Sequence, residues 1–108
     1  MNNFRHLVQS LLLMTDKLII LGDFNQNILK GDTLVSDYME SIGFRQCVTK
    51  PTTEGGTLID HVYIRGISLM DITVLPTYYS YHEAILIKIK GSLFTVYSVS
   101  PELQMSAL

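Results

Sequence analysis

Residues 18–25 read LIILGDFN, and this stretch decides how the rest of the chain is interpreted. Its first four residues are apolar and rich in isoleucine, which is typical of a buried strand. The run stops at Gly22, and Asp23 and Asn25 then bring polar groups to the C-terminal end of the strand. On an extended backbone residues two apart point to the same face. The stretch therefore predicts a strand that delivers a carboxylate and a carboxamide to one site, at the sheet edge where ligands bind in open α/β sheets.

A simpler interpretation of the same residues is a strand that ends in an ordinary turn. Gly, Asp and Asn are common turn residues, and strands are often followed by them. The two interpretations differ in what must lie nearby. A site needs further polar groups from other segments, whereas a turn needs none.

Composition places the chain among single-domain globular proteins. Of its 108 residues, 47% are hydrophobic and 17% are charged, which are too few charges for a disordered chain. The formal net charge of −2 gives no basic footprint for nucleic acid, although a locally basic groove would still accept one. The single Cys47 predicts a small buried hydrophobe in an intracellular protein. No run approaches the roughly 18 apolar residues of a spanning helix, so no membrane partner is expected.

Hydrophobic periodicity predicts a sequence of alternating helices and strands within one domain, residues 1–99. Helices are predicted at residues 3–14 and 33–42, the second capped by Asp32, ended by Gly43 and buried through Leu34, Tyr38, Met39 and Ile42. Strands are predicted at residues 18–21, 45–49, 57–65, 71–75, 83–90 and 93–99. Residues 100–108 are predicted to be a frayed tail.

Two more polar clusters interrupt apolar strands, at Asp60-His61 and at residues 80–82. Asp60 lies among branched aliphatic residues and needs a partner, because burying an unpaired charge is costly. His82 is the predicted partner, and a carboxylate on one imidazole nitrogen fixes the tautomer of the ring. His61 points to the opposite face and is predicted to have a packing or surface role. Taken singly, each histidine is more often structural than catalytic.

Three motifs in this order resemble the C-terminal half of the endonuclease/exonuclease/phosphatase superfamily. They are GDFN at 22–25, GTLIDH at 56–61 and SYH at 80–82. The stretch KPTTEGGTLIDHVYI at residues 50–64 is most similar to the apurinic-endonuclease-like domains of non-LTR retrotransposons. The resemblance covers about residues 18–89, most of the chain.

The resemblance implies both a fold and an activity. The fold is an α/β four-layer sandwich, of which this chain is expected to form the C-terminal half, with mostly one mixed or antiparallel sheet and two helices on its outer face. The activity is phosphodiester hydrolysis that depends on Mg²⁺ or Mn²⁺. Nucleic acid, DNA first, is the expected partner, with a nuclear location, and RNA and small phosphate esters stay open as substrates.

The resemblance also assigns roles to single residues. Asp23 orients or deprotonates the attacking water, and Asn25 and Ser80 bind the phosphate. His82, held by Asp60, stabilises charge on a non-bridging oxygen. The metal ion polarises the phosphoryl oxygen, because phosphoryl transfer is catalysed mostly by positioning and charge stabilisation.

Two departures from the family pattern predict little activity for the chain alone. The family motif Ser-Asp-His is Ser80-Tyr81-His82 here, and a neutral phenol is a poor ligand for Mg²⁺. The family's N-terminal half, which supplies an Asn and a metal-binding Glu, has no counterpart before Leu18. No metal ligand is therefore assigned with certainty. An inner sheet face left uncovered by the missing half is expected to favour self-association.

Two other functions stay open. The chain is either a non-catalytic remnant or interaction module of the same fold, or an unrelated small α/β binding domain. The positions of Asp23, Asn25, Asp60 and His82 separate the last possibility from the others. Convergence of these side chains favours the family, whereas scatter over the surface favours a plain turn.

Overall fold

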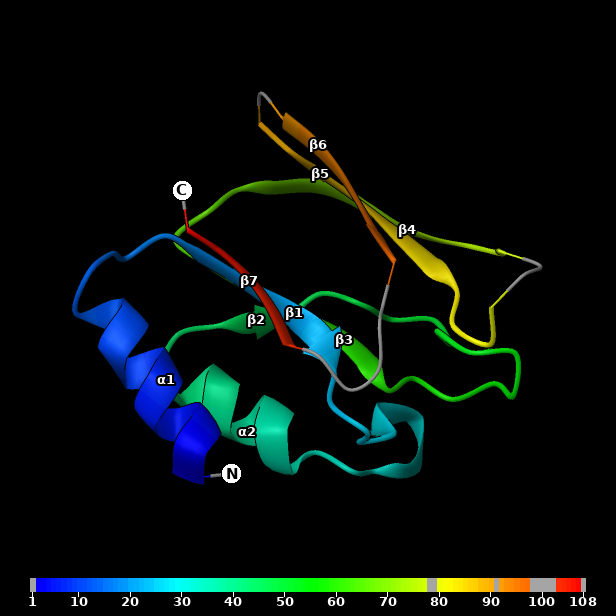
Figure 1. Ribbon diagram of the computed structural model, residues 1–108, viewed down its shortest axis with the longest axis horizontal. Coiled ribbons are helices and arrows are strands. Elements are labelled where there is room, and N and C mark those ends of the chain that lie inside the picture. Colours follow the sequence, from blue (N-terminus) through cyan, green and yellow to red (C-terminus); the bar gives the residue numbers. More distant parts are fainter. Residues whose placement is uncertain (1, 78–79, 91, 98–102, 108) are drawn as a thin grey trace.

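The computed structural model describes residues 2–77, 80–90, 92–97 and 103–107, which form an α+β fold (Figure 1). The helices are α1 (Asn2–Leu12), the 3-10 helix η1 (Ile28–Lys30) and α2 (Leu34–Ser41). The strands are β1 (Leu18–Asp23), β2 (Arg45–Gln46), β3 (Asp60–Arg65), β4 (Leu69–Leu75), β5 (Ala84–Ile89), β6 (Ser92–Tyr97) and β7 (Leu103–Ala107).

The strands form two antiparallel sheets. The first has the order β2-β3-β1-β7 and the second the order β4-β5-β6. In Figure 1 the helices α1 and α2 lie on one side of the first sheet and the second sheet lies on the other. The predicted α/β class and the two helices on an outer face are confirmed. The strands are divided between two sheets, however, rather than gathered mostly in one.

Strand β1 is buried on both faces, which explains why its sequence is an unbroken apolar run. Leu18 and Ile20 face the helices, where they pack in a core that includes Met39 of α2. Ile19 and Leu21 face the second sheet. Because side chains alternate along a strand, one short run contributes to two cores.

The core between the sheets joins β1 and β3 to β5. It includes Val62 and Ile64 from β3, and Ile85, Ile87 and Ile89 from β5, all under 5% exposed. The single buried face predicted for β5 is confirmed. The prediction of an uncovered inner sheet face is wrong for the described residues, because the second sheet covers the first. Self-association stays a prediction.

The start of α2 differs from the sequence prediction. Thr33, not Asp32, occupies the N-cap position, and the N–H of Val35 is satisfied by the side-chain carbonyl of Gln26 at 2.9 Å. Asp32 instead accepts a hydrogen bond from the N–H of residue 27 at 3.3 Å. The carboxylate thus closes the loop before the helix and is not free to cap it.

The buried stripe of α2 includes Val35 in place of the predicted Leu34. Val35 and Met39, four residues apart, are buried, and Tyr38 and Ile42 are partly buried beside them. Leu34 is 59% exposed, because it lies one helical position outside the stripe that Val35 and Met39 define. No helix in the described part of the chain combines the length and the apolar character needed to cross a bilayer.

The end of the chain contains a strand where a frayed tail is predicted. Residues 103–107 form β7, which pairs antiparallel with β1 from Leu18 to Gly22. Residues 100–102 and 108 of the predicted tail lie outside the described residues. The predicted strand at 93–99 is β6, and its last two positions also lie outside them.

We expect Leu18→Ala to be strongly destabilising. Leu18 is 1% exposed in the core beneath the helices, and truncating a buried leucine costs about 2–5 kcal/mol. Leu13→Ala is the matched control, since Leu13 is 91% exposed and its truncation should change stability by less than about 0.5 kcal/mol. Urea unfolding followed by circular dichroism measures both. Equal costs for the two variants would contradict this placement of the core.

Cys47 should react slowly with thiol reagents in the folded protein. Its side chain is buried as predicted, and burial raises the pKa of the thiol, so less thiolate is present at a given pH. Because it is the only cysteine in the chain, Ellman's reagent at pH 8 reports on it alone. The expected result is slow labelling that becomes fast in 6 M guanidinium chloride. Labelling at the same rate in both conditions would show that the thiol is accessible.

Candidate functional site

A contact between Asp60 and His82 joins the first sheet to the second. His82 Nδ1 lies 2.8 Å from Asp60 Oδ2, and the Asp60 side chain is only 1% exposed. A carboxylate oxygen accepts, so Nδ1 carries the proton and Nε2 faces the other way. The predicted pairing of these two residues is confirmed, while their catalytic roles stay predictions.

Asp23 completes a cluster around the imidazole ring. Its Oδ2 lies 3.6 Å from His82 Nε2, on the side of the ring opposite Asp60. Asp23 at the end of β1 is paired directly with Asp60 at the start of β3, which brings the two carboxylates together. One ligand atom from each of the three residues lies within 4.8 Å of the others. Three separate segments therefore converge on one place.

The second oxygen of Asp60 has no hydrogen-bond partner among the described residues. This Oδ1 atom is buried, and an unsatisfied buried carboxylate oxygen is costly. With both carboxylates ionised, the cluster is net negative whatever the state of the ring, so it attracts a cation. Carboxylate oxygens are the ligands that Mg²⁺ and Mn²⁺ prefer. The donor set therefore fits a divalent metal ion, with His82 as an additional nitrogen donor.

Thr52 holds the two halves of the cluster in place, and sequence reasoning missed it. Its side chain is completely buried, and its Oγ1 accepts the backbone N–H of Asp60 at 3.1 Å. Its backbone carbonyl accepts the N–H of Glu83 at 2.8 Å, and the next residue, Thr53, forms a β-bridge with His82. A threonine in a turn-rich segment has no periodic pattern that would reveal this role.

Ser80 fixes the backbone that carries His82. The Ser80 hydroxyl accepts the His82 N–H at 3.2 Å, and the Thr77 hydroxyl donates to the His82 carbonyl at 3.0 Å. The ring is therefore aimed by its own neighbours as well as by Asp60. The predicted phosphate contact of Ser80 stays a prediction.

Asn25 does not continue the strand, so the prediction of one extended face shared with Asp23 is wrong. Its φ of +52° is in the left-handed region, and the residue is exposed. The reason is Asp23, whose Oδ1 accepts the Asn25 N–H at 2.9 Å and closes a turn. Asp23 thus serves both interpretations of the motif, since Oδ1 closes the turn while Oδ2 faces His82.

His61 secures the loop behind the cluster, which confirms its predicted packing role. Its Nε2 lies 2.9 Å from the Gln26 carbonyl, an acceptor, so Nε2 carries the proton and Nδ1 accepts from the Tyr63 hydroxyl at 2.7 Å. The ring stacks on Phe24 with centroids 5.1 Å apart. Burial lowers the pKa of His61, so the ring stays neutral.

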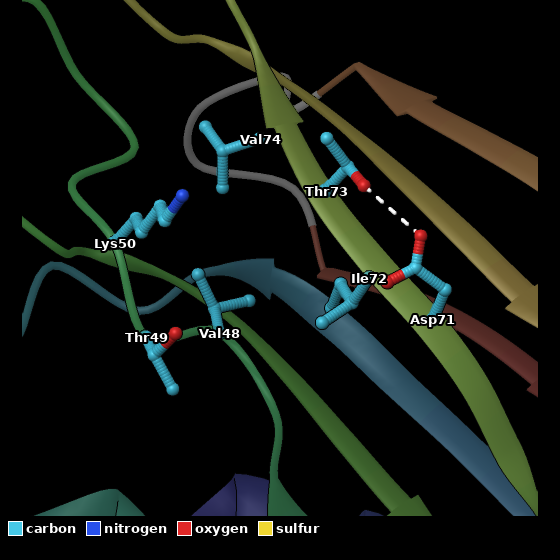
Figure 2. Close-up of a pocket in the computed structure, with 7 residues that line it drawn as sticks. All are labelled: Val48, Thr49, Lys50, Asp71, Ile72, Thr73 and Val74. Carbon is cyan, nitrogen blue, oxygen red and sulfur yellow. Dashed lines mark hydrogen bonds between the residues drawn. The ribbon is translucent and has the colours of Figure 1, made fainter.

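A separate cavity of about 240 Å³ lies between residues 48–50 and strand β4 (Figure 2). In Figure 2 the Lys50 side chain extends toward Val74, and Thr73 donates a hydrogen bond to Asp71 at 3.3 Å. The residues that line it are Val48, Thr49, Lys50, Asp71, Ile72, Thr73 and Val74. None of them belongs to the cluster, so this cavity is not part of the candidate site.

No family model, curated protein or solved structure matches this chain. The candidate site is therefore defined by its own geometry. That geometry brings together Asp23, Asp60 and His82, and it leaves Asn25 on an exposed turn beside them.

We expect Thr52→Val to destabilise the protein by about 1–3 kcal/mol, since it leaves the buried N–H of Asp60 without an acceptor. Thr49→Val makes the same chemical change at an exposed position and should be close to neutral. Urea unfolding gives the two free energies. A neutral Thr52→Val variant would show that this hydroxyl does not hold the cluster.

Proposed function

We propose that this chain carries the C-terminal catalytic half of a divalent-metal-dependent phosphodiesterase that acts on nucleic acid. The observation that carries the proposal is the convergence of Asp23, Asp60 and His82 from three segments. The buried Oδ1 of Asp60, which has no hydrogen-bond partner among the described residues, also supports it. Buried carboxylate oxygens in structural ion pairs are normally hydrogen-bonded, so an unpaired one suits a ligand. A nuclear location and DNA as the first substrate belong to the same proposal.

The residues have distinct roles in the proposed reaction. Asp60 orients the ring of His82, which presents its Nε2 side to a non-bridging oxygen of the phosphate. Asp23 accepts a proton from the attacking water as the water oxygen bonds to phosphorus. The bond to the leaving oxygen breaks, and that oxygen takes a proton from solvent. Asn25, on the turn that Asp23 closes, donates to the phosphate.

A divalent ion would be held by carboxylate oxygens of Asp23 and Asp60. When bound, it supplies charge neutralisation at the phosphoryl oxygens. With His82 turned to the phosphate, the described cluster offers two carboxylates to the ion, so water, substrate or another protein segment must complete the coordination. We propose that a second half of the fold is the partner that does so.

A non-catalytic interaction module of the same fold is the second candidate function. Tyr81 favours it, because this neutral and exposed side chain stands where the family pattern has a carboxylate. Loss of one metal ligand weakens binding of the ion while leaving the fold intact. The two candidates differ in whether restoring that carboxylate restores hydrolysis.

Nicking of supercoiled plasmid DNA in the presence of Mg²⁺ tests the proposal. We expect little activity from the chain alone. Tyr81→Asp combined with the N-terminal half of a retrotransposon-type endonuclease domain, supplied in trans, should nick the plasmid until EDTA is added. Asp23→Asn in that background should lower the rate by about 10²–10⁴-fold, as for loss of a general base. Asp71→Asn, an exposed carboxylate on β4, is the matched control and should change little.

Two outcomes would contradict these expectations. Absence of metal-dependent nicking in every combination would reject the catalytic function and leave the interaction module. Strong nicking by the unaltered chain alone would show that Tyr81 does not impair metal binding.

A further inference from the structure

Tyr81 is an exposed aromatic side chain beside the imidazole of the candidate site. It is 52% exposed, whereas the side chain of His82 is only 14% exposed. The two ring centroids are 5.9 Å apart and the ring planes meet at 86°. A large part of the phenol ring therefore faces solvent beside the imidazole of His82.

The backbone of Tyr81 is anchored, and the tip of its ring lies against a glycine. Its backbone carbonyl accepts the Glu54 N–H at 3.0 Å, which ties residue 81 to the turn at 53–56. Its hydroxyl oxygen lies against Gly55, so closely that a Cβ at this position would collide with it. Unlike Gly56, Gly55 does not have a left-handed φ, so the backbone does not require glycine there. The absence of a side chain at residue 55 makes room for the ring.

An exposed aromatic ring on an anchored backbone suits the binding of another flat ring. Tyrosine gives a large contact area at a low cost in conformational entropy. Stacking of bases on such side chains recurs in proteins that bind single-stranded nucleic acid, and it tolerates any base because each has a π face.

We propose that Tyr81, supported by Gly55, forms a stacking subsite for a nucleobase next to the phosphate bound at His82. This inference rests on the proposed function and narrows its substrate class. A base that stacks on Tyr81 must be free of its partner strand, so the preferred ligand is single-stranded or locally unpaired nucleic acid. Tyr81 stands where the family pattern has a carboxylate, and in this proposal it adds a contact to the base instead.

Binding of two polymers without metal tests the subsite, because no cleavage then occurs. One is fluorescein-labelled oligo(dT), and the other is a labelled abasic polymer of equal length and charge. Binding of each polymer is measured by fluorescence anisotropy in EDTA. We expect the unaltered chain to bind oligo(dT) more tightly. Tyr81→Ala should weaken oligo(dT) binding roughly tenfold, within the range for loss of one stacked base, and leave the abasic polymer unchanged. Tyr81→Phe should keep the preference.

Gly55→Ala provides an independent variant that leaves Tyr81 in the chain. It should displace the ring and reduce oligo(dT) binding, and it should have no further effect once Tyr81→Ala is present. Tyr38→Ala removes a tyrosine from α2, which packs on the helix-covered face of the first sheet, and should leave the preference intact. Circular dichroism confirms that each variant is folded.

The inference fails if the chain binds neither polymer, binds both equally, or keeps its preference in Tyr81→Ala. These outcomes do not depend on the result of the plasmid-nicking test. Preference for oligo(dT) without any nicking under the conditions above would keep the subsite and reject the catalytic function. Nicking without a preference for oligo(dT) would keep the catalytic function and reject the subsite.

Discussion

The candidate site depends on the hydrogen bonds of one buried threonine. Thr52 accepts from the segment that begins β3 through its hydroxyl, and from the segment that begins β5 through its carbonyl. Because Thr52 is completely buried, water does not compete for either acceptor. The two sheets are thus joined near the starts of β3 and β5 by polar contacts, as well as by the apolar core between them. The 2.8 Å contact of Asp60 with His82 lies at this junction.

The parts of the site that could be predicted are those governed by local rules. A charged residue inside an apolar strand requires a partner, and this rule led from Asp60 to His82. The position of Asn25 could not be predicted in the same way, because the strand pattern competes with the tendency of Asp23 to close a turn. The role of Thr52 depends on backbone groups brought to it by the fold, and no pattern in the sequence encodes them.

The same distinction applies to the fold. The alternation in β5 identifies which face is buried, and the apolar run of β1 identifies a strand buried on both sides. Periodicity does not say which surfaces meet, so the division of the strands into two sheets was beyond it. Strand β7 was also missed, since a short terminal segment with few branched residues gives a weak strand pattern, and its pairing with β1 depends on the rest of the sheet.

The central place of β1 has a consequence for the motions of the site. Strand β1 is hydrogen-bonded on both edges, to β3 and β7, and covered on both faces. Amide protons in such a strand exchange with solvent only when most of the protein unfolds. Asp23, at the end of this strand and paired with Asp60, is therefore anchored to the firmly held centre of the sheet, whereas His82 precedes β5 on a connecting segment. We expect motions that open or close the cluster to move the segment that carries His82, while Asp23 stays in place.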